Sequence, residues 1–171
     1  MSDEDLYPGE ASDPELTPSE EARLELCHPD AKLRFTAIAA AMWYRGLPVY
    51  IGETGRTDAE QAAAVAAGHS SEHQVHSWHT LKPPRACDFR KRLSGNRADP
   101  TTNDEAFFRA LYEEATIAGC RSLAFRADGT KLLLQTTHGP VWDAGHVEYR
   151  EPYLSLAEAF AAEGGASGSN V

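Results

Sequence analysis

The chain has 171 residues, of which 42% are hydrophobic and 25% are charged, and its formal charge at pH 7 is −10. This length favours one domain with its own hydrophobic core, and no apolar run is long enough to predict a membrane span. Positions 1–25 hold nine acidic residues and one basic residue, so the remaining body is nearly neutral. A nearly neutral body argues against nonspecific nucleic-acid binding.

Both ends of the chain are predicted to be flexible. Residues 1–18 combine many acids with three prolines, which predicts a loosely held leader. The tail at 164–171 is small and polar, which leaves 19–163 as the expected folded domain. The opening MSDEDLYPGE lacks the apolar core of a signal peptide. We therefore expect a protein that is made in the cytoplasm without an export signal. We also expect it to be a monomer.

The three cysteines are expected to be free thiols. Cys27, Cys87 and Cys120 are odd in number, widely spaced and outside any CxxC motif. A disulfide framework or a cysteine-rich zinc site is therefore not expected.

The first strong helix prediction covers residues 30–45, with Asp30 as the N-cap and Gly46 as the stop. Helical spacing predicts one face made of Leu33, Ala37, Ala40, Ala41 and Tyr44.

Further elements follow in alternation along the chain. The helix at 57–67 opens with a Thr57–Glu60 capping box and closes at Gly68. A hairpin is predicted from 123–126 and 131–136 around the turn at 127–129. The other predicted elements are strands at 48–52, 86–90 and 146–149 and helices at 103–118 and 155–162. Both element types, with hairpin-like pairing in the second half, favour an α+β fold with a small, mostly antiparallel sheet.

Four of the seven histidines lie between positions 69 and 79. The segment fits either a histidine-rich metal tract or a solvated polar loop. His79 differs from His69, His73 and His76 because Asp88 follows on a predicted strand. Alternation along that strand turns Asp88 to one face and Cys87 to the other.

A second candidate group lies in VWDAGHVEY (141–149), where Asp143 precedes His146 by three residues and Glu148 shares a strand face with His146. Two imidazoles and one carboxylate form a common catalytic zinc set that leaves a coordination position for water. An unligated carboxylate then serves as the general base. A structural Asp–His pair is the alternative that these residues alone leave open.

Three segments in order resemble one family. GETGRTDAEQ (52–61), SWHTLKPPRACD (77–88) and DAGHVE (143–148) are similar to the motifs of zinc peptidases of the D-alanyl-D-alanine carboxypeptidase type. That group includes VanY-type carboxypeptidases, D,D-dipeptidases and phage L-alanyl-D-glutamate endolysins. The resemblance covers residues 24–150 and implies a hedgehog/D-Ala-D-Ala-peptidase-like fold.

The resemblance also implies a role for each matching residue. It makes His79, Asp88 and His146 the ligands of Zn²⁺, Asp143 the general base and Arg56 the group that stabilises the oxyanion. Three residues are candidate substrate-binding groups, each with an alternative. Gln61 orients substrate or is an exposed helix residue, Ser77 contacts substrate or shapes the loop, and Glu148 supports a ligand or is a strand-edge charge.

One spacing departs from the family pattern. His79 and Asp88 are nine residues apart, whereas the family motif has seven and a glycine between them. We expect the loop before the strand to absorb the insertion, with His76 as the substitute ligand if His79 is displaced. The basic residues that follow are interpreted as a solvated loop, with attraction to an anionic cell wall as the alternative: Arg85, Arg90, Lys91, Arg92 and Arg97.

The resemblance therefore implies a zinc peptidase that acts on bacterial peptidoglycan, with an L-alanyl-D-glutamate endopeptidase of phage endolysin type favoured. The missing signal peptide supports this version, because such an enzyme reaches the cell wall only after release. A D-alanyl-D-alanine carboxypeptidase or dipeptidase is the first alternative. A non-catalytic, metal-stabilised wall-binding or phage structural module is the second.

Overall fold

The computed structural model describes residues 16–70 and 76–163. The helices are α1 (Pro18–Glu25), α2 (Pro29–Tyr44), α3 (Asp58–Ala66), α4 (Glu105–Ile117) and α5 (Leu156–Glu163). The strands are β1 (Val49–Ile51), β2 (Ala86–Leu93), β3 (Arg97–Ala98), β4 (Arg121–Ser122), β5 (Leu134–Thr136), β6 (Gly139–Val141) and β7 (His146–Glu148). Nearly all of the predicted leader, the tail and His73 lie outside the described residues.

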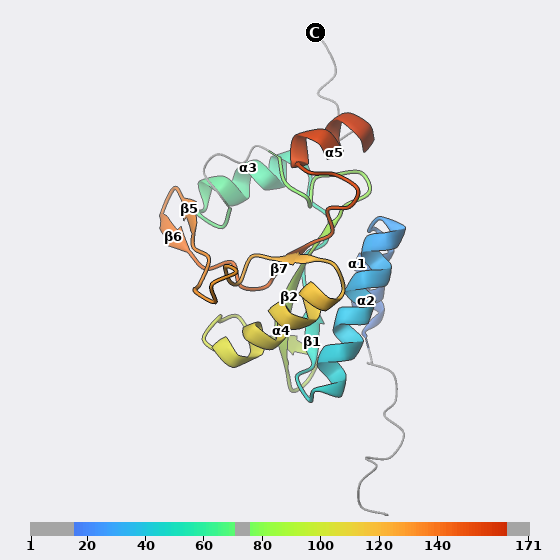
Figure 1. Cartoon of the computed structure of the whole chain (residues 1–171), viewed down its shortest axis with the longest axis vertical. Helices are drawn as coiled ribbons and strands as arrows, with labels where there is room; N and C mark the ends of the chain where they lie inside the picture. Colours follow the sequence, from blue (N-terminus) through green and yellow to red (C-terminus); the bar gives the residue numbers. More distant parts are fainter. Residues whose placement is uncertain (1–15, 71–75, 164–171) are drawn as a thin grey trace, which may run out of the picture.

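A small antiparallel sheet forms the centre of the molecule (Figure 1). Its strand order is β1-β2-β7-β4, with β3 paired to the far end of β2, while β5 and β6 form a separate hairpin. All of these pairs are antiparallel. The predicted α+β class and mostly antiparallel sheet are therefore confirmed.

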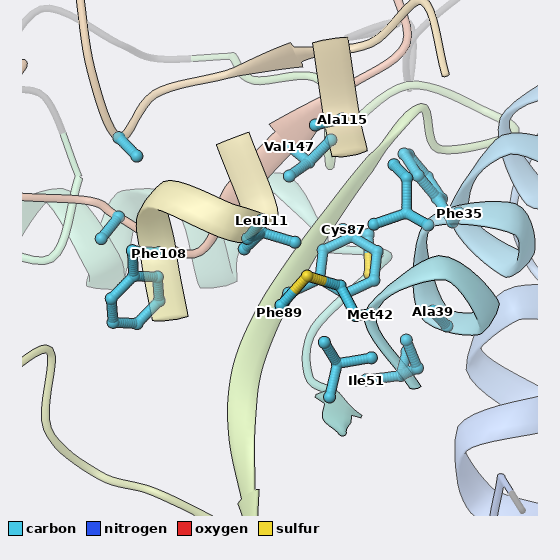
Figure 2. Close-up of a cluster of buried hydrophobic side chains, with 14 of the residues drawn as sticks. Phe35, Ala39, Met42, Ile51, Cys87, Phe89, Phe108, Leu111, Ala115 and Val147 are labelled. Atoms are coloured by element: carbon cyan, nitrogen blue, oxygen red, sulfur yellow. The ribbon is translucent and has the colours of Figure 1, made fainter. Parts of the chain in front are cut away.

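The main core lies between one face of the sheet and the helices α2 and α4. Figure 2 shows Cys87 and Phe89 of β2 close to Phe35 and Met42 of α2 and to Leu111 of α4. Side chains alternate along a strand, so Asp88 projects from the opposite face. The apolar face of β2 thus anchors the sheet, and its other face is left for polar residues.

Helix α2 differs from its prediction at the start and in its buried face. The N-cap is His28, whose ring nitrogen accepts a hydrogen bond from the Asp30 backbone N–H at 3.3 Å, so Asp30 is not the cap. The predicted face is wrong, since Leu33 and Tyr44 are 71% and 68% exposed. The buried residues of the helix are Ala31, Phe35, Ile38, Ala39 and Met42.

The predicted hairpin at 123–136 forms only around its turn, where Leu132 N–H donates to the Ala124 carbonyl at 3.0 Å, and its outer ends pair elsewhere. Arg126 N–H donates to the Thr130 carbonyl at 2.8 Å and a single bridge joins Phe125 to Lys131. The start of the segment before the turn pairs with β7, since Leu123 N–H donates to the His146 carbonyl at 3.0 Å. The chain after the turn pairs instead with β6.

The remaining predicted elements are present, and α1 was not predicted. Helix α3 has the predicted Thr57–Glu60 capping box, and α4 ends before Gly119, whose φ is +72°. Helix α1 begins with a second capping box made by Thr17 and Glu20. Among the described residues, none of the helices has the length and apolar character needed to cross a membrane.

Candidate metal centre

Three side chains from separate segments converge at the polar face of the sheet. His79 Nε2, Asp88 Oδ1 and His146 Nδ1 lie 3.2 Å from one another in all three pairings. His79 and His146 are buried, and the Asp88 side chain is 22% exposed. Together they form a cluster that could hold a metal ion.

The outer sides of both imidazoles are already hydrogen-bonded. His79 Nδ1 lies 3.0 Å from the Thr54 carbonyl, which can only accept, so this nitrogen carries the hydrogen. His146 Nε2 lies 3.1 Å from Glu148 Oε1 and likewise donates. In the neutral rings the inward nitrogens are therefore acceptors. Three acceptors face one another, an arrangement that a cation stabilises.

The spacing fits a tetrahedral zinc site. Zinc bonds of about 2.0–2.1 Å at tetrahedral angles place neighbouring ligand atoms about 3.3 Å apart, close to the 3.2 Å seen here. Two imidazoles and one carboxylate also leave the fourth position open. The donor set and its geometry thus suit zinc.

Two groups of the cluster, Asp88 and His146, have strongly shifted pKa values. Burial alone would raise the pKa of Asp88, but positive charge on His79 and hydrogen bonds from both histidines hold it well below its usual range. Burial lowers the pKa of His146, but hydrogen bonds with Asp88 and Glu148 outweigh it and raise the pKa well above its usual range. Without a cation His146 therefore holds a second proton on the inward Nδ1, and binding of a metal ion would displace that proton.

Backbone contacts hold the three groups in register. Asp88 lies opposite His146 in the β2–β7 pairing. Gly145 is required beside them, because a Cβ there would lie 2.2 Å from the Phe89 carbonyl oxygen. On the other side of β2, the Asp88 backbone N–H donates to the Glu53 carbonyl at 2.9 Å.

The long His79–Asp88 spacing is absorbed as expected by the loop before β2. Arg85 N–H donates to the Trp78 carbonyl at 3.0 Å, which closes the inserted residues into a loop. Ser77 shapes the turn that presents His79, since its hydroxyl accepts from the His79 N–H at 3.2 Å. The Ser77 side chain also lines the site cavity, so its contact with substrate stays a prediction.

The cluster lies in the wall of a cavity of about 480 Å³. The cavity is lined from α3, β2, β5, β6 and β7 and from the loops between them. Trp142 lines it and packs on Phe108 and Phe125, whereas Trp78 is buried in a second apolar cluster beneath α5. Of these two tryptophans, Trp142 therefore faces the cavity.

Arg56 is held on the cavity wall by two neighbours. Glu53 accepts hydrogen bonds from Arg56 Nε and from its terminal amino group. Gln61 Oε1 accepts another at 2.7 Å, and Gln61 Nε2 donates to Ser70 Oγ at 3.0 Å. Gln61 is fully buried, so the alternative of an exposed helix residue is wrong, and its role in orienting substrate stays a prediction.

Asp143 also lines the cavity, with Oδ2 3.9 Å from His146 Nδ1 and a side chain that is 34% exposed. Partial burial and the negative charge of Asp88 raise the pKa of Asp143, against the opposing effect of the histidines. The Asp143 carboxylate therefore lies beside the cluster, but it is farther from His146 than the 3.2 Å that separates the three cluster atoms.

Glu148 is an internal partner of the cluster. It is 3% exposed, and besides His146 it binds Arg150 Nε at 2.6 Å. The alternative of a strand-edge charge is therefore wrong. A partner that orients a ligand histidine in this way also fixes its tautomer.

Two other interpretations of the sequence are settled by position. His76 contacts Asp58 and the Phe160 ring and does not join the cluster. The basic segment is not a solvated loop, since Arg85 pairs with Glu163, Lys91 with Asp104 and Arg92 with Glu20. Arg90 lines the cavity, and the sequence analysis did not single it out for the site.

The fold has a counterpart among solved structures. It is similar to the crystal structure of the Serratia marcescens L-Ala D-Glu endopeptidase ChiX, with a TM-score of 0.51 and 21% sequence identity, over 78% of this chain and 87% of that chain. No protein-family model matches the chain, and no curated protein sequence matches it. The likeness supports the predicted peptidase-like fold.

Proposed function

We propose that the protein is a zinc-dependent peptidase that hydrolyses peptidoglycan stem peptides, with L-alanyl-D-glutamate endopeptidase as its activity. The convergence of three acceptor atoms on one point, in a cavity that also holds Asp143 and Arg56, carries the proposal. The motif resemblance and the fold shared with an L-Ala D-Glu endopeptidase support it.

In this proposal His79, Asp88 and His146 hold the ion. A bound zinc ion would make water a better nucleophile at neutral pH and polarise the peptide carbonyl. Asp143 accepts the proton of the attacking water and then delivers it to the leaving amine as the C–N bond breaks. Arg56 donates hydrogen bonds to the carbonyl oxygen as negative charge develops. The products are a new carboxylate and a new amine.

The residues disfavour a purely structural metal site. Such a site is closed by four protein ligands, whereas this cluster has three and opens on a cavity. A structural ion also requires neither a neighbouring free carboxylate nor an arginine held in place by Glu53 and Gln61.

The experiment is digestion of purified peptidoglycan fragments by the zinc-loaded protein, with the new termini identified by mass spectrometry. The proposal predicts fragments that begin with D-glutamate. Release of terminal D-alanine would instead assign a carboxypeptidase. His146→Ala should abolish cleavage, and His76→Ala is the matched control from outside the cluster. Absence of any cleavage by the zinc-loaded protein would contradict the proposal.

A further inference from the structure

Arg90 places a second guanidinium in the cavity. It follows Asp88 by two residues on β2, so both side chains project from the same face about 6.7 Å apart along the strand. Arg90 lines the cavity together with Asp143 and Trp142. Its backbone is fixed in the sheet by pairing with Tyr50 of β1. The side chain therefore begins from a rigid position beside the metal cluster.

Among the described residues, the charge of Arg90 has no ion-pair partner. Within residues 16–70 and 76–163, no carboxylate or carbonyl lies within hydrogen-bonding distance of its guanidinium. Lys91 and Arg92, the next residues of the strand, pair with Asp104 and Glu20. Arg56, the other arginine of the cavity, is bound by Glu53. Arg90 is thus the arginine of the cavity wall whose hydrogen-bond donors stay available to a ligand.

The neighbour of Arg90 indicates which part of a substrate it would meet. Arg90 and Asp143 line the same cavity. In the proposed reaction Asp143 delivers the proton to the leaving amine, so that amine lies beside it. In an amino acid the amine nitrogen and the carboxyl carbon are bonded to the same α-carbon. The α-carboxyl of the leaving residue therefore stays close to that amine, in the cavity that Arg90 lines.

We infer that Arg90 binds the free α-carboxylate of the residue that leaves with the new amine, and that it selects peptides in which this carboxylate is free. The inference rests on the proposed function. A guanidinium binds a carboxylate through paired, charge-assisted hydrogen bonds. In an ordinary peptide the next peptide bond consumes this carboxylate. It is free in D-glutamate joined onward through its side-chain carboxyl, and in a carboxyl-terminal D-alanine.

Two matched pairs of peptides test the inference on the zinc-loaded protein. The first pair is L-Ala–D-Glu–L-Lys, linked through the D-Glu side chain, with the D-Glu α-carboxyl either free or as the amide. The second pair is acylated D-Ala–D-Ala with a free or an amidated terminus. We expect kcat/KM to favour the free acid by about 10–100-fold in one pair. The pair that shows the preference identifies the source of the carboxylate.

Variants then assign the preference to Arg90. Arg90→Gln should bring the acid-to-amide ratio close to one, mainly through KM, while Arg90→Lys should retain part of it. Arg97→Gln is the matched control, because Arg97 lies on the adjoining β3 with its Nε bonded to the Ser94 carbonyl, and it should keep the full ratio. Bound zinc, measured for each variant, reports an intact site.

The outcomes separate this inference from the proposed function. Equal cleavage of acid and amide by the unaltered protein, or an unchanged ratio in Arg90→Gln, would overturn the role of Arg90 and leave the peptidase proposal standing. Failure of the zinc-loaded protein to cleave any of the four peptides would overturn both.

Discussion

Both halves of β2 carry buried charged side chains, but the hydrogen bonds of these side chains are completed in different ways. In the second half, Arg92 donates to Glu20 Oε1 at 2.6 Å and to the Val49 carbonyl at 3.0 Å. The Glu20 carboxylate also accepts from the Ile51 N–H at 2.8 Å. Each donor there meets an acceptor, so the group is complete within the protein.

The first half of β2 lacks this balance. When both imidazoles that face Asp88 are neutral, their hydrogens are directed outward to Thr54 and Glu148, so three acceptors converge on one point. In a buried ion pair each charge is satisfied by its partner, and removing either partner is destabilising, whereas converging acceptors bind an external cation. Hydrogen-bond direction, more than burial or charge count, therefore distinguishes the structural cluster from the candidate site.

Removal of a proposed zinc ligand is the strongest test of this difference between the two halves of β2. His146→Ala should reduce bound zinc from about one ion per chain to near zero and abolish hydrolysis, because two protein ligands hold zinc poorly. The fold should persist, since the core lies on the other face of the sheet. Metal analysis and circular dichroism check both parts. Undiminished zinc in this variant would remove His146 from the site.

Variants of Asp143 test whether the fourth coordination position, which the three proposed ligands leave open, is used for catalysis. Asp143→Asn should lose about 10²–10⁴-fold in hydrolysis while keeping zinc, because an amide cannot accept the proton of the attacking water. Asp143→Ala should be similarly impaired. If Asp143 only shapes the turn before His146, asparagine would substitute well and turnover would survive. Steady-state kinetics of the two zinc-loaded variants distinguish these results.

At the structural end of β2 the loss should appear in stability. Glu20→Gln breaks a buried ion pair and should lower the free energy of unfolding by about 3–5 kcal/mol. Zinc bound per folded chain should stay unchanged. Denaturant unfolding with Glu21→Gln, an exposed change on the same helix, as control measures the difference. A comparable loss in the control would deny Glu20 its special role.

The same pair predicts a pH dependence. Burial raises the pKa of Glu20, but hydrogen bonds from Arg92 and the backbone lower it below its ordinary value of 4.5. The unfolded chain then binds the proton more readily, so the stability from ionised Glu20 is complete above that value and is lost as the pH falls through the lower folded value. The stability gap between the unaltered chain and Glu20→Gln should therefore narrow on acidification below 4.5. A constant gap would contradict this.

The smallest expected effect belongs to Glu148, the partner of the proposed ligand His146. Glu148→Ala should weaken zinc binding by about 10–100-fold, as loss of an orienting carboxylate does at other sites. Glu148→Gln should fall between it and the unaltered chain, because its amide oxygen can still accept from His146. Competition with a chelator measures the affinity. Equal affinity in all three proteins would show that Glu148 does not support the site.

The sequence predicted the parts of the fold that have local causes. The capping box of Thr57 and Glu60 and the stop at Gly119 depend on neighbouring residues, and both are present. The buried face of α2 was mispredicted, because Leu33 and Phe35 are equally apolar and only packing against β2 decides between them. The pairing of β5 with β6 was missed for the same reason, since β7 competes for the chain before the turn.

The candidate site shows the same division. Motifs brought His79, Asp88 and His146 to notice, and the structure places them together. The Thr54 carbonyl that orients His79 has no side-chain signal and could not have been found. Arg90 was grouped with neighbours of the same charge, although strand alternation from Asp88 could have separated it.

The most direct measurement is anomalous diffraction at the zinc edge from crystals grown with zinc. The account predicts one strong peak about 2.0–2.2 Å from His79 Nε2, Asp88 Oδ1 and His146 Nδ1, with open space toward the cavity. A peak on His69 or His76 with none between the three ligands, at saturating zinc, would contradict the metal centre and the peptidase activity proposed from it.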